Sequence, residues 1–276
     1  MDFDQVKIVV ILHWTAVVCY VAATGLCIGG RSFGKPRWQE RALTLALPGF
    51  VLHGIGLLVW WRHVGHGPYI DRFEVLSSYS WILMALYVFL YRFYTPLRFT
   101  GLVVYPLVFL LVATGLFLEP QVRNLPPTFR SVWLVLHVLF YKVSFAAIVA
   151  AGSFSALYIM KERGRLERFE RLPDLETLDV YSYRFAGFGF AFWAIGMLAG
   201  SIWAYQSWNM FWNWDPVQTW SLVTWFLFGL YLHMRRFYGW KGSKAAWLYI
   251  ICFALSVISI FITPFFEKSI HAEYFK

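Results

Sequence analysis

Charged side chains are scarce in this chain. Asp, Glu, Lys and Arg together make up 14% of its 276 residues, whereas soluble domains contain about 25%. Hydrophobic residues make up 59% of the chain, and 21% of all residues are aromatic. This composition leaves too little polar surface for a soluble globule, so it indicates an integral membrane protein.

Cysteine is also rare. Cys19, Cys27 and Cys252 lie inside apolar runs and form no CxxC pair, which argues against a thiol redox motif or a thiolate metal site. The net charge is +9, but the basic residues are dispersed over connecting segments. We therefore expect no nucleic-acid partner, because nucleic-acid binding needs clustered positive charge.

Long apolar runs dominate the rest of the sequence. A helix of about 18 to 25 apolar residues can cross the hydrocarbon layer of a lipid bilayer. The runs lack the alternation of barrel strands, and backbone polar groups in lipid must be satisfied internally. The predicted fold is all-α, a polytopic bundle of about eight transmembrane helices in a single integral membrane domain, 1–276. The predicted spans are 7–28, 43–61, 75–91, 99–118, 131–160, 184–206, 217–234 and 245–266.

The distribution of Lys and Arg over the loops predicts the orientation, because these residues favour the cytoplasmic side. With both termini on the outer side, the inner loops hold 16 Lys and Arg residues, and the outer segments and termini hold 7. Both termini are therefore predicted to be periplasmic, and 161–184 to be a cytoplasmic loop. The tryptophan-rich segment 203–220 then lies outside.

Residues 203–225 hold six of the 15 tryptophans and no Lys or Arg. Within this stretch, Asp215, Pro216 and Gln218 form a helix-start pattern. Asp can cap the first free N–H groups, Pro suits the first helical position, and Gln three residues after the cap can complete a capping box. The stretch is predicted to be an aromatic platform that ends where the next membrane helix begins.

Three histidines stand out beside this platform. His137 lies about two turns below the outer surface, and His271 follows the last span, so both are expected on the outer side. Two imidazoles beside a wide, uncharged aromatic surface suit haem, a flat macrocycle with a central iron. His233 lies about 24 Å deeper than the start of its span, which indicates an inner site. Packing histidines and interfacial tryptophan anchors would give the same pattern without a ligand.

Several segments resemble the CcsA/ResC family of cytochrome c biogenesis proteins and its tryptophan-rich WWD motif. The motif corresponds to WNMFWNWDPVQTW, followed by YLHMR. Further segments in family order are GHGPYIDRFEVLSSYSW, WLVLHV and LDVYSYRFAGFGFAF. The resemblance covers roughly residues 60 to 276, and the first two spans match only in character.

The resemblance implies a haem b-binding subunit of a holocytochrome c synthase, or haem lyase, in the bacterial inner membrane. With a CcsB/ResB-like membrane protein, it would move haem across the lipid bilayer and present it on the periplasmic face for thioether attachment to the CxxCH motif of an apocytochrome c. His137 and His271 would ligate the external haem iron. His233 would ligate an inner haem, whose second ligand would come from the partner, with His53 and His13 as substitutes. The porphyrin would be cradled by Trp208, Trp212, Trp214, Asp215 and Trp220.

Two other functions fit the same features. One is a HemX-type membrane regulator of haem biosynthesis, and the other is a haem exporter without lyase activity. The chain also departs from the family signature, which has Lys and Glu at Val217 and Gln218 and Gly at Asn209. These departures leave the finer haem contacts open, and Arg72, Arg123 and Arg130 are outer-side candidates for the propionates.

Overall fold

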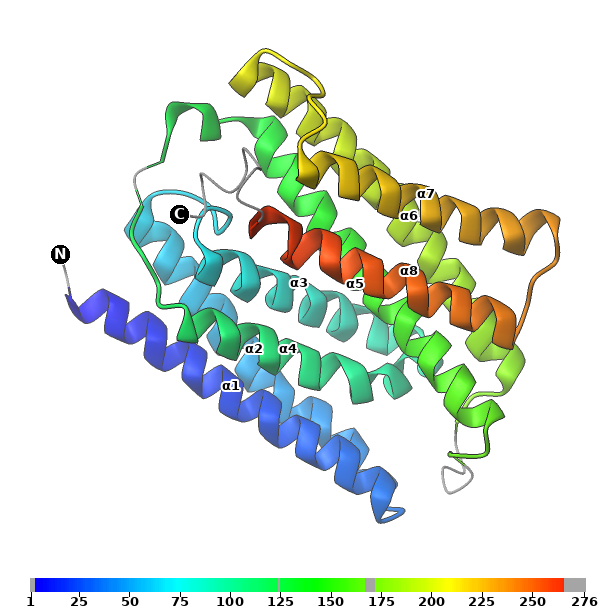
Figure 1. The fold of residues 1–276 in the computed structure, drawn as a ribbon. Helices are drawn as coiled ribbons and strands as arrows, with labels where there is room; N and C mark the ends of the chain where they lie inside the picture. The colour runs from blue at the N-terminus through cyan, green and yellow to red at the C-terminus, as the bar shows by residue number, and fades with distance from the viewer. Residues whose placement is uncertain (1–2, 124, 167–171, 266–276) are drawn as a thin grey trace. The chain divides into compact units, whose positions relative to one another are not determined.

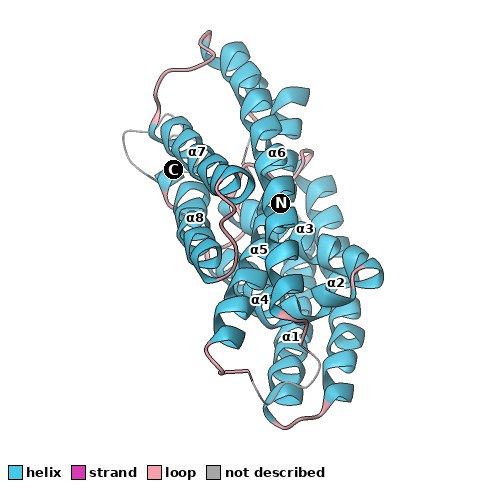
Figure 2. Ribbon diagram, turned by 90° about the vertical axis from the view of Figure 1, so that its right-hand side faces the viewer, coloured by secondary structure: helices cyan, strands magenta, loops and turns pink. Residues whose placement is uncertain are grey.

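The computed structural model describes residues 3–123, 125–166 and 172–265. Within these ranges the chain forms helices and loops and no strand (Figure 2). This confirms the predicted all-α fold. The prediction for His271 lies outside the described residues.

Eight long helices follow one another along the described part of the chain (Figure 1). They are α1 (Phe3–Ser32), α2 (Pro36–Val64), α3 (Arg72–Phe93), α4 (Gly101–Phe117), α5 (Val132–Glu162), α6 (Leu175–Trp208), α7 (Pro216–Phe237) and α8 (Ser243–Phe261). Three short 3-10 helices lie between or after them: η1 (Thr95–Thr100), η2 (Pro127–Phe129) and η3 (Thr263–Phe265).

Seven helices of the described chain are long and apolar enough to cross a membrane. They are all of the long helices except α7, along which polar side chains such as Gln218, Thr224 and His233 recur. The chain is thus a multi-pass membrane protein with a helical fold. The crossing of α7 and the orientation of the bundle stay predictions.

The long helices group into two compact units. The first contains α1 to α4, in which α1 packs on α2 and α4, and α3 packs on α4. The second contains α5 to α8, in which α5 packs along α6 and on α8, and α7 packs on α6 and α8.

Close packing of α5 against α6 depends on glycines that face α5. A Cβ atom added to Gly189 would lie 2.7 Å from Ile148 Cγ1, and one added to Gly196 would lie 2.7 Å from Tyr141 Cδ2. Small residues at such positions let two helix backbones approach closely in a membrane. The second unit is therefore built on a tight α5–α6 pair.

The start of α6 differs from the predicted span, which begins at residue 184. Asp174 caps the helix by accepting a hydrogen bond from the Thr177 N–H at 2.6 Å, so α6 already begins at Leu175. Hydrogen bonds from the Thr177 side chain and from this N–H lower the pKa of the Asp174 carboxyl. With 34 residues, α6 is about 50 Å long. It is therefore longer than the hydrocarbon layer of about 30 Å.

Candidate functional site

The tryptophan-rich segment 203–220 contains the end of α6, the turn between α6 and α7, and the start of α7. Its location on the outer side stays a prediction. Asp215 caps α7 by accepting a hydrogen bond from the Val217 N–H at 3.0 Å, and Pro216 is the first helical residue. Gln218 does not complete the predicted capping box. Its side-chain oxygen accepts from the Asn213 N–H at 3.0 Å instead, so it fastens the turn two residues before the cap.

Two residues of this turn have positive φ angles. Asn209, at 57°, is the left-handed cap that ends α6, and Trp214 has a φ of 59°. Asn tolerates this conformation better than most residues other than Gly. The departure of Asn209 from the family's Gly therefore leaves the turn geometry intact.

His137 lies on α5 with its ring fixed against α6. Its Nδ1–H donates to the Gly196 carbonyl oxygen at 2.8 Å, which leaves Nε2 as the acceptor nitrogen of the neutral ring. A Cβ atom added to Gly200 would collide with the same ring. Metal-ligating histidines characteristically donate their other ring nitrogen in this way, so His137 has the tautomer and orientation that an iron ligand needs.

His137 and part of the aromatic platform line one small pocket, here called the tryptophan pocket. Its volume is about 40 Å³, well below the ~300–1,000 Å³ of typical ligand pockets. The lining residues come from α5, α6, the turn and α7. They are His137, Tyr141, Met197, Gly200, Ser201, Trp203, Ala204, Trp208, Trp212, Val217, Gln218 and Ser221.

The remaining predicted platform residues lie beside this pocket. Trp214 is 71% exposed and contacts Trp212 edge-on, with ring centroids 5.8 Å apart. Trp220 is 37% exposed on α7, whereas Asp215 is buried at its helix cap. The contacts of Asp215 with the backbone account for its position without a ligand.

A hydrogen-bonded group forms the base of the tryptophan pocket. Ser221 on α7 is hydrogen-bonded to the Tyr141 hydroxyl and accepts from Trp193 Nε1 at 3.0 Å. Trp203 donates to the Thr128 carbonyl oxygen at 2.9 Å and contacts Trp208 at 5.1 Å between ring centroids. Three helices are thereby joined beneath the pocket.

Sequence reasoning missed the residues that hold His137 in place. Gly196 and Gly200 form a GxxxG pattern, which is a known signal of close helix packing in membranes. That signal could have identified α6 as the helix beside His137. The roles of Tyr141 and Ser221 had no comparable signal, because they depend on which helices meet.

His233 lies near the other end of α7, on an exposed position. Its ring contacts Phe237 and Tyr238, with centroids 4.7 and 5.7 Å away. It lines a second pocket, here called the arginine pocket, with a volume of about 480 Å³. The lining residues come from α6 and α7. They are Tyr183, Arg184, Gly187, Phe190, Gly229, Leu232, His233, Arg236 and Phe237.

An ion pair beside the arginine pocket ties α6 to α7. The Arg235 guanidinium donates to both carboxylate oxygens of Asp179, at 2.5 and 2.7 Å. Asp179 also accepts from the Gly242 N–H at 3.0 Å, and Arg235 lies over the Tyr183 ring. Bidentate geometry of this kind fixes both side chains, so the end of α7 and the turn that follows it are anchored to α6.

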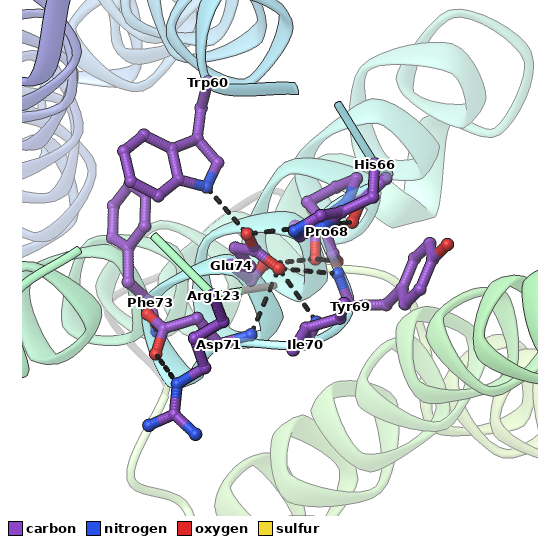
Figure 3. Close-up of polar contacts among 11 residues, drawn as sticks. Trp60, His66, Pro68, Tyr69, Ile70, Asp71, Phe73, Glu74 and Arg123 are labelled. Atoms are coloured by element: carbon purple, nitrogen blue, oxygen red, sulfur yellow. Dashed lines mark hydrogen bonds and ion pairs between the residues drawn. The ribbon is translucent and has the colours of Figure 1, made fainter. Parts of the chain in front are cut away.

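In the first unit, the loop before α3 surrounds the buried Glu74 carboxylate (Figure 3). One carboxylate oxygen accepts from the Tyr69, Ile70 and Asp71 N–H groups at 3.1, 2.8 and 3.1 Å. The other accepts from Trp60 Nε1 at 2.8 Å. These four hydrogen bonds fix the loop that carries the family-like GHGPY segment.

His66 and Asp71 flank this carboxylate. His66 Nδ1 donates to the Gly67 carbonyl oxygen at 2.9 Å and lies 3.9 Å from Glu74. Burial raises the pKa of the Asp71 carboxyl, while the Phe73 N–H and the charge of Arg123, whose Nε is 3.7 Å away, lower it in part. Of the proposed propionate contacts, Arg123 thus pairs with Asp71, Arg72 begins α3, and Arg130 is exposed after η2.

His13 and His53 are both buried in the first unit and share one hydroxyl. The His13 Nδ1–H donates to the Val9 carbonyl oxygen at 2.7 Å, so its Nε2 accepts from Ser77 at 3.0 Å. His53 Nε2 in turn donates to Ser77 Oγ at 2.8 Å. Both Nε2 atoms therefore take part in hydrogen bonds to Ser77, which link α1, α2 and α3.

Known proteins resemble this chain over most of its length. A family model described as cytochrome C assembly protein matches residues 69–271. The cytochrome c biogenesis protein CcsA of Chlamydomonas reinhardtii is 34% identical over 199 residues, which cover 69% of this chain and 56% of that protein. CcsA of Chlorella vulgaris is 33% identical and covers 69% of this chain and 72% of its own length. CcsA of Synechococcus elongatus is 28% identical, with 77% and 80% covered.

A solved structure has the same fold. The cytochrome c heme lyase CcmF matches with a TM-score of 0.71 and 15% sequence identity, covering 98% of this chain and 48% of the CcmF chain. At this identity the likeness concerns the fold alone, and this chain spans about half the length of CcmF. The family match over more than half of the chain decides its membership: the chain belongs to the cytochrome c assembly protein family, as one of its CcsA members.

Proposed function

We propose that this protein is the haem-handling subunit of a cytochrome c synthase. It would bring haem b across the membrane and present it on the periplasmic face of a bacterial inner membrane. There the CxxCH thiols of an apocytochrome c would be joined to the haem. A CcsB/ResB-like protein would act as the partner. One observation carries this proposal: His137 shares a pocket with three tryptophans, Trp203 and Trp208 at the end of α6 and Trp212 in the turn before α7.

The tryptophan pocket supplies a ligand nitrogen and an aromatic wall. The Gly196 carbonyl fixes the proton of His137 on Nδ1, so Nε2 is the nitrogen that would face iron. Trp208 and Trp212 are uncharged and half-buried, which suits the apolar face of a porphyrin. When bound, haem supplies the vinyl groups that react with thiols, whereas the protein supplies orientation.

The volume of the tryptophan pocket sets a condition on this function. About 40 Å³ is too small to enclose a porphyrin, so binding requires Trp208 or Trp212 to turn outward. Both belong to the end of α6 and the turn that follows it, where side chains can rearrange without disturbing the α5–α6 contact. His271 is the proposed second ligand on this side.

The arginine pocket is the proposed inner site. At about 480 Å³ it falls within the range of ligand pockets without rearrangement. The exposed imidazole of His233 would ligate iron from one side, and the partner would supply the other ligand. The two pockets lie toward opposite ends of α7, as expected if haem is accepted at one and presented at the other.

Haem spectra of the protein purified with its partner test this proposal. His137→Ala and His271→Ala are each expected to change the axial ligation of the outer haem, and His233→Ala that of the inner haem. His63→Ala serves as a matched control, because His63 lines neither pocket. Unchanged haem content and ligation in both outer-site variants would refute the outer site.

Synthase and exporter functions are separated by a second measurement. This protein and a CcsB/ResB-like partner are expressed with a CxxCH reporter in a host that lacks other maturation machinery. A synthase subunit gives a reporter with covalently bound haem. Release of haem with no covalent product would favour the exporter.

A further inference from the structure

We propose that Arg184 and Arg236 form a carboxylate-binding pair that holds the two propionates of haem at the arginine pocket. This inference rests on the proposed binding of haem iron by His233, and it concerns the propionate edge of the same ligand. Both arginines belong to the inner-loop Lys and Arg residues whose excess predicts the orientation of the chain in the membrane. Their place in the lining of a pocket gives them a further role.

Both arginines lie at the same end of the pocket. Arg184 belongs to the N-terminal part of α6, and Arg236 is the last residue but one of α7. Because α6 and α7 are joined at the tryptophan-rich turn and run in opposite directions (Figure 1), these two segments lie together. On α7, Arg236 is three residues beyond His233, which places the two side chains on one helix face about 4.5 Å apart along the axis. A ligand at His233 can therefore reach both guanidinium groups with one edge.

Two glycines leave room for a flat body on the other side of the pocket. A Cβ atom added to Gly187 on α6 would meet no atom of the described residues within 4 Å, so this backbone faces open space. A Cβ atom on Gly229 of α7 would lie 3.4 Å from Phe190, another lining residue. The pocket thus has an aromatic and glycine surface beside its histidine and a basic end, which matches the apolar ring and acidic edge of haem.

The charges favour a ligand with two carboxylates. Among the described residues, those that line the pocket include two arginines and no Asp or Glu. The nearby Asp179 is held by Arg235 and the Gly242 N–H, so its charge is already paired within the protein. Guanidinium groups bind carboxylates through paired hydrogen bonds, and each such charge-assisted bond is stronger than a neutral one. A dianionic edge would neutralise both arginines at once.

An anionic lipid headgroup is the competing occupant, because arginines near a membrane surface also attract lipid phosphates. The imidazole N–H of His233 can also donate to a phosphate, but a phosphate headgroup has no flat ring for the surface at Gly187 and Gly229. This flat surface favours haem. Comparison of haem b with its dimethyl ester separates haem from lipid as the occupant.

The test uses the full chain with its partner in nanodiscs and compares haem b with haem dimethyl ester, in which the propionates are uncharged. The measured quantity is the haem affinity of the site that is lost in the His233→Ala variant. Arg184→Gln and Arg236→Gln are each expected to weaken haem b binding about 10-fold. Wild type should bind the ester as weakly as the double variant binds haem b, and the double variant should not distinguish the two ligands.

Three further variants make the result decisive. Lys244→Gln removes a charge near the same end of the unit outside the pocket and should leave haem affinity unchanged. Gly187→Leu fills the open space without a backbone clash and should abolish binding with both arginines intact. Arg184→Lys with Arg236→Lys should restore part of the affinity, because charge is kept while the planar fork is lost.

Different failures have different meanings. If wild type binds haem b and its ester equally, or if Lys244→Gln weakens binding as much as the arginine variants, the carboxylate-binding pair is refuted while haem binding at His233 stands. If the arginine variants change only the retention of phosphatidylglycerol in nanodiscs, the pair binds lipid and the inference is also refuted. If His233→Ala removes no haem, the proposed inner site itself is wrong.

Discussion

At the residue scale, the orientation of His137 follows from its neighbours on α6. One hydrogen bond to the Gly196 carbonyl fixes the tautomer, and the missing side chain of Gly200 leaves space for the ring. The sequence pointed to His137 as a ligand through its depth in the membrane. It could not indicate the tautomer, because that depends on which carbonyl the neighbouring helix presents.

Gly200→Ala should displace the His137 ring, since the added methyl group occupies its place. We expect altered axial ligation in the haem spectrum and a loss of about 1–3 kcal/mol of stability from overpacking. Gly25→Ala is the control, because a Cβ atom at Gly25 on α1 meets nothing within 4 Å. A wild-type spectrum for Gly200→Ala would contradict the proposed fixation of the ring.

Glu74→Gln should loosen the loop before α3. The change replaces a carboxylate oxygen that accepts hydrogen bonds by an amide group that donates them, so N–H groups of the loop or of Trp60 lose their acceptor. We expect a loss of about 1–3 kcal/mol, seen as a lower midpoint of thermal unfolding in detergent. Glu162→Gln, at an exposed site, should leave the midpoint unchanged. Equal midpoints for both variants would show that the network is not stabilising.

At the element scale, the start of α7 could be predicted from the sequence, whereas the start of α6 was missed. Asp215 and Pro216 correctly indicated the start of α7, because capping needs only local residues. The early start of α6 was missed, although Asp174 is a good cap, because the predicted span followed the apolar run alone. Gln218 bonds to Asn213 and not to the cap residue, since the left-handed Trp214 turns the chain back.

Two substitutions of Asp215 separate a capping role from a role in haem binding. Asp215→Ala removes the acceptor for the Val217 N–H and should cost about 1 kcal/mol of stability. Asp215→Asn keeps a capping oxygen and should preserve both stability and haem content. Stability would be followed by unfolding in detergent, and haem by absorbance. Loss of haem in Asp215→Asn at normal stability would instead assign the carboxylate to the ligand.

At the scale of the whole molecule, composition and the pattern of the apolar runs were sufficient for the fold class. A membrane chain whose long apolar runs lack the alternation of barrel strands forms helices, and its loop charges indicate an orientation. The two pockets could not be predicted, because they depend on the pairing of α5, α6 and α7 within the second unit. The packing of the helices also separates the histidines into two kinds. His13 and His53 are hydrogen-bonded to Ser77, whereas His137 and His233 line pockets.

The proposed function as a whole requires haem to be bound at one pocket and presented at the other. Loss of either His137 or His233 should therefore stop formation of the same product, a cytochrome with covalently bound haem. Variants that fold normally but lack one of these imidazoles are informative, because neither ring is part of the buried core.

The most direct test is the yield of covalent haem in a CxxCH reporter, produced with a CcsB/ResB-like partner in a host without other maturation machinery. Wild type and His63→Ala are expected to give haem-bearing reporter, whereas His137→Ala should give little or none at equal protein level. A wild-type yield from His137→Ala would contradict the proposal that the tryptophan pocket presents haem.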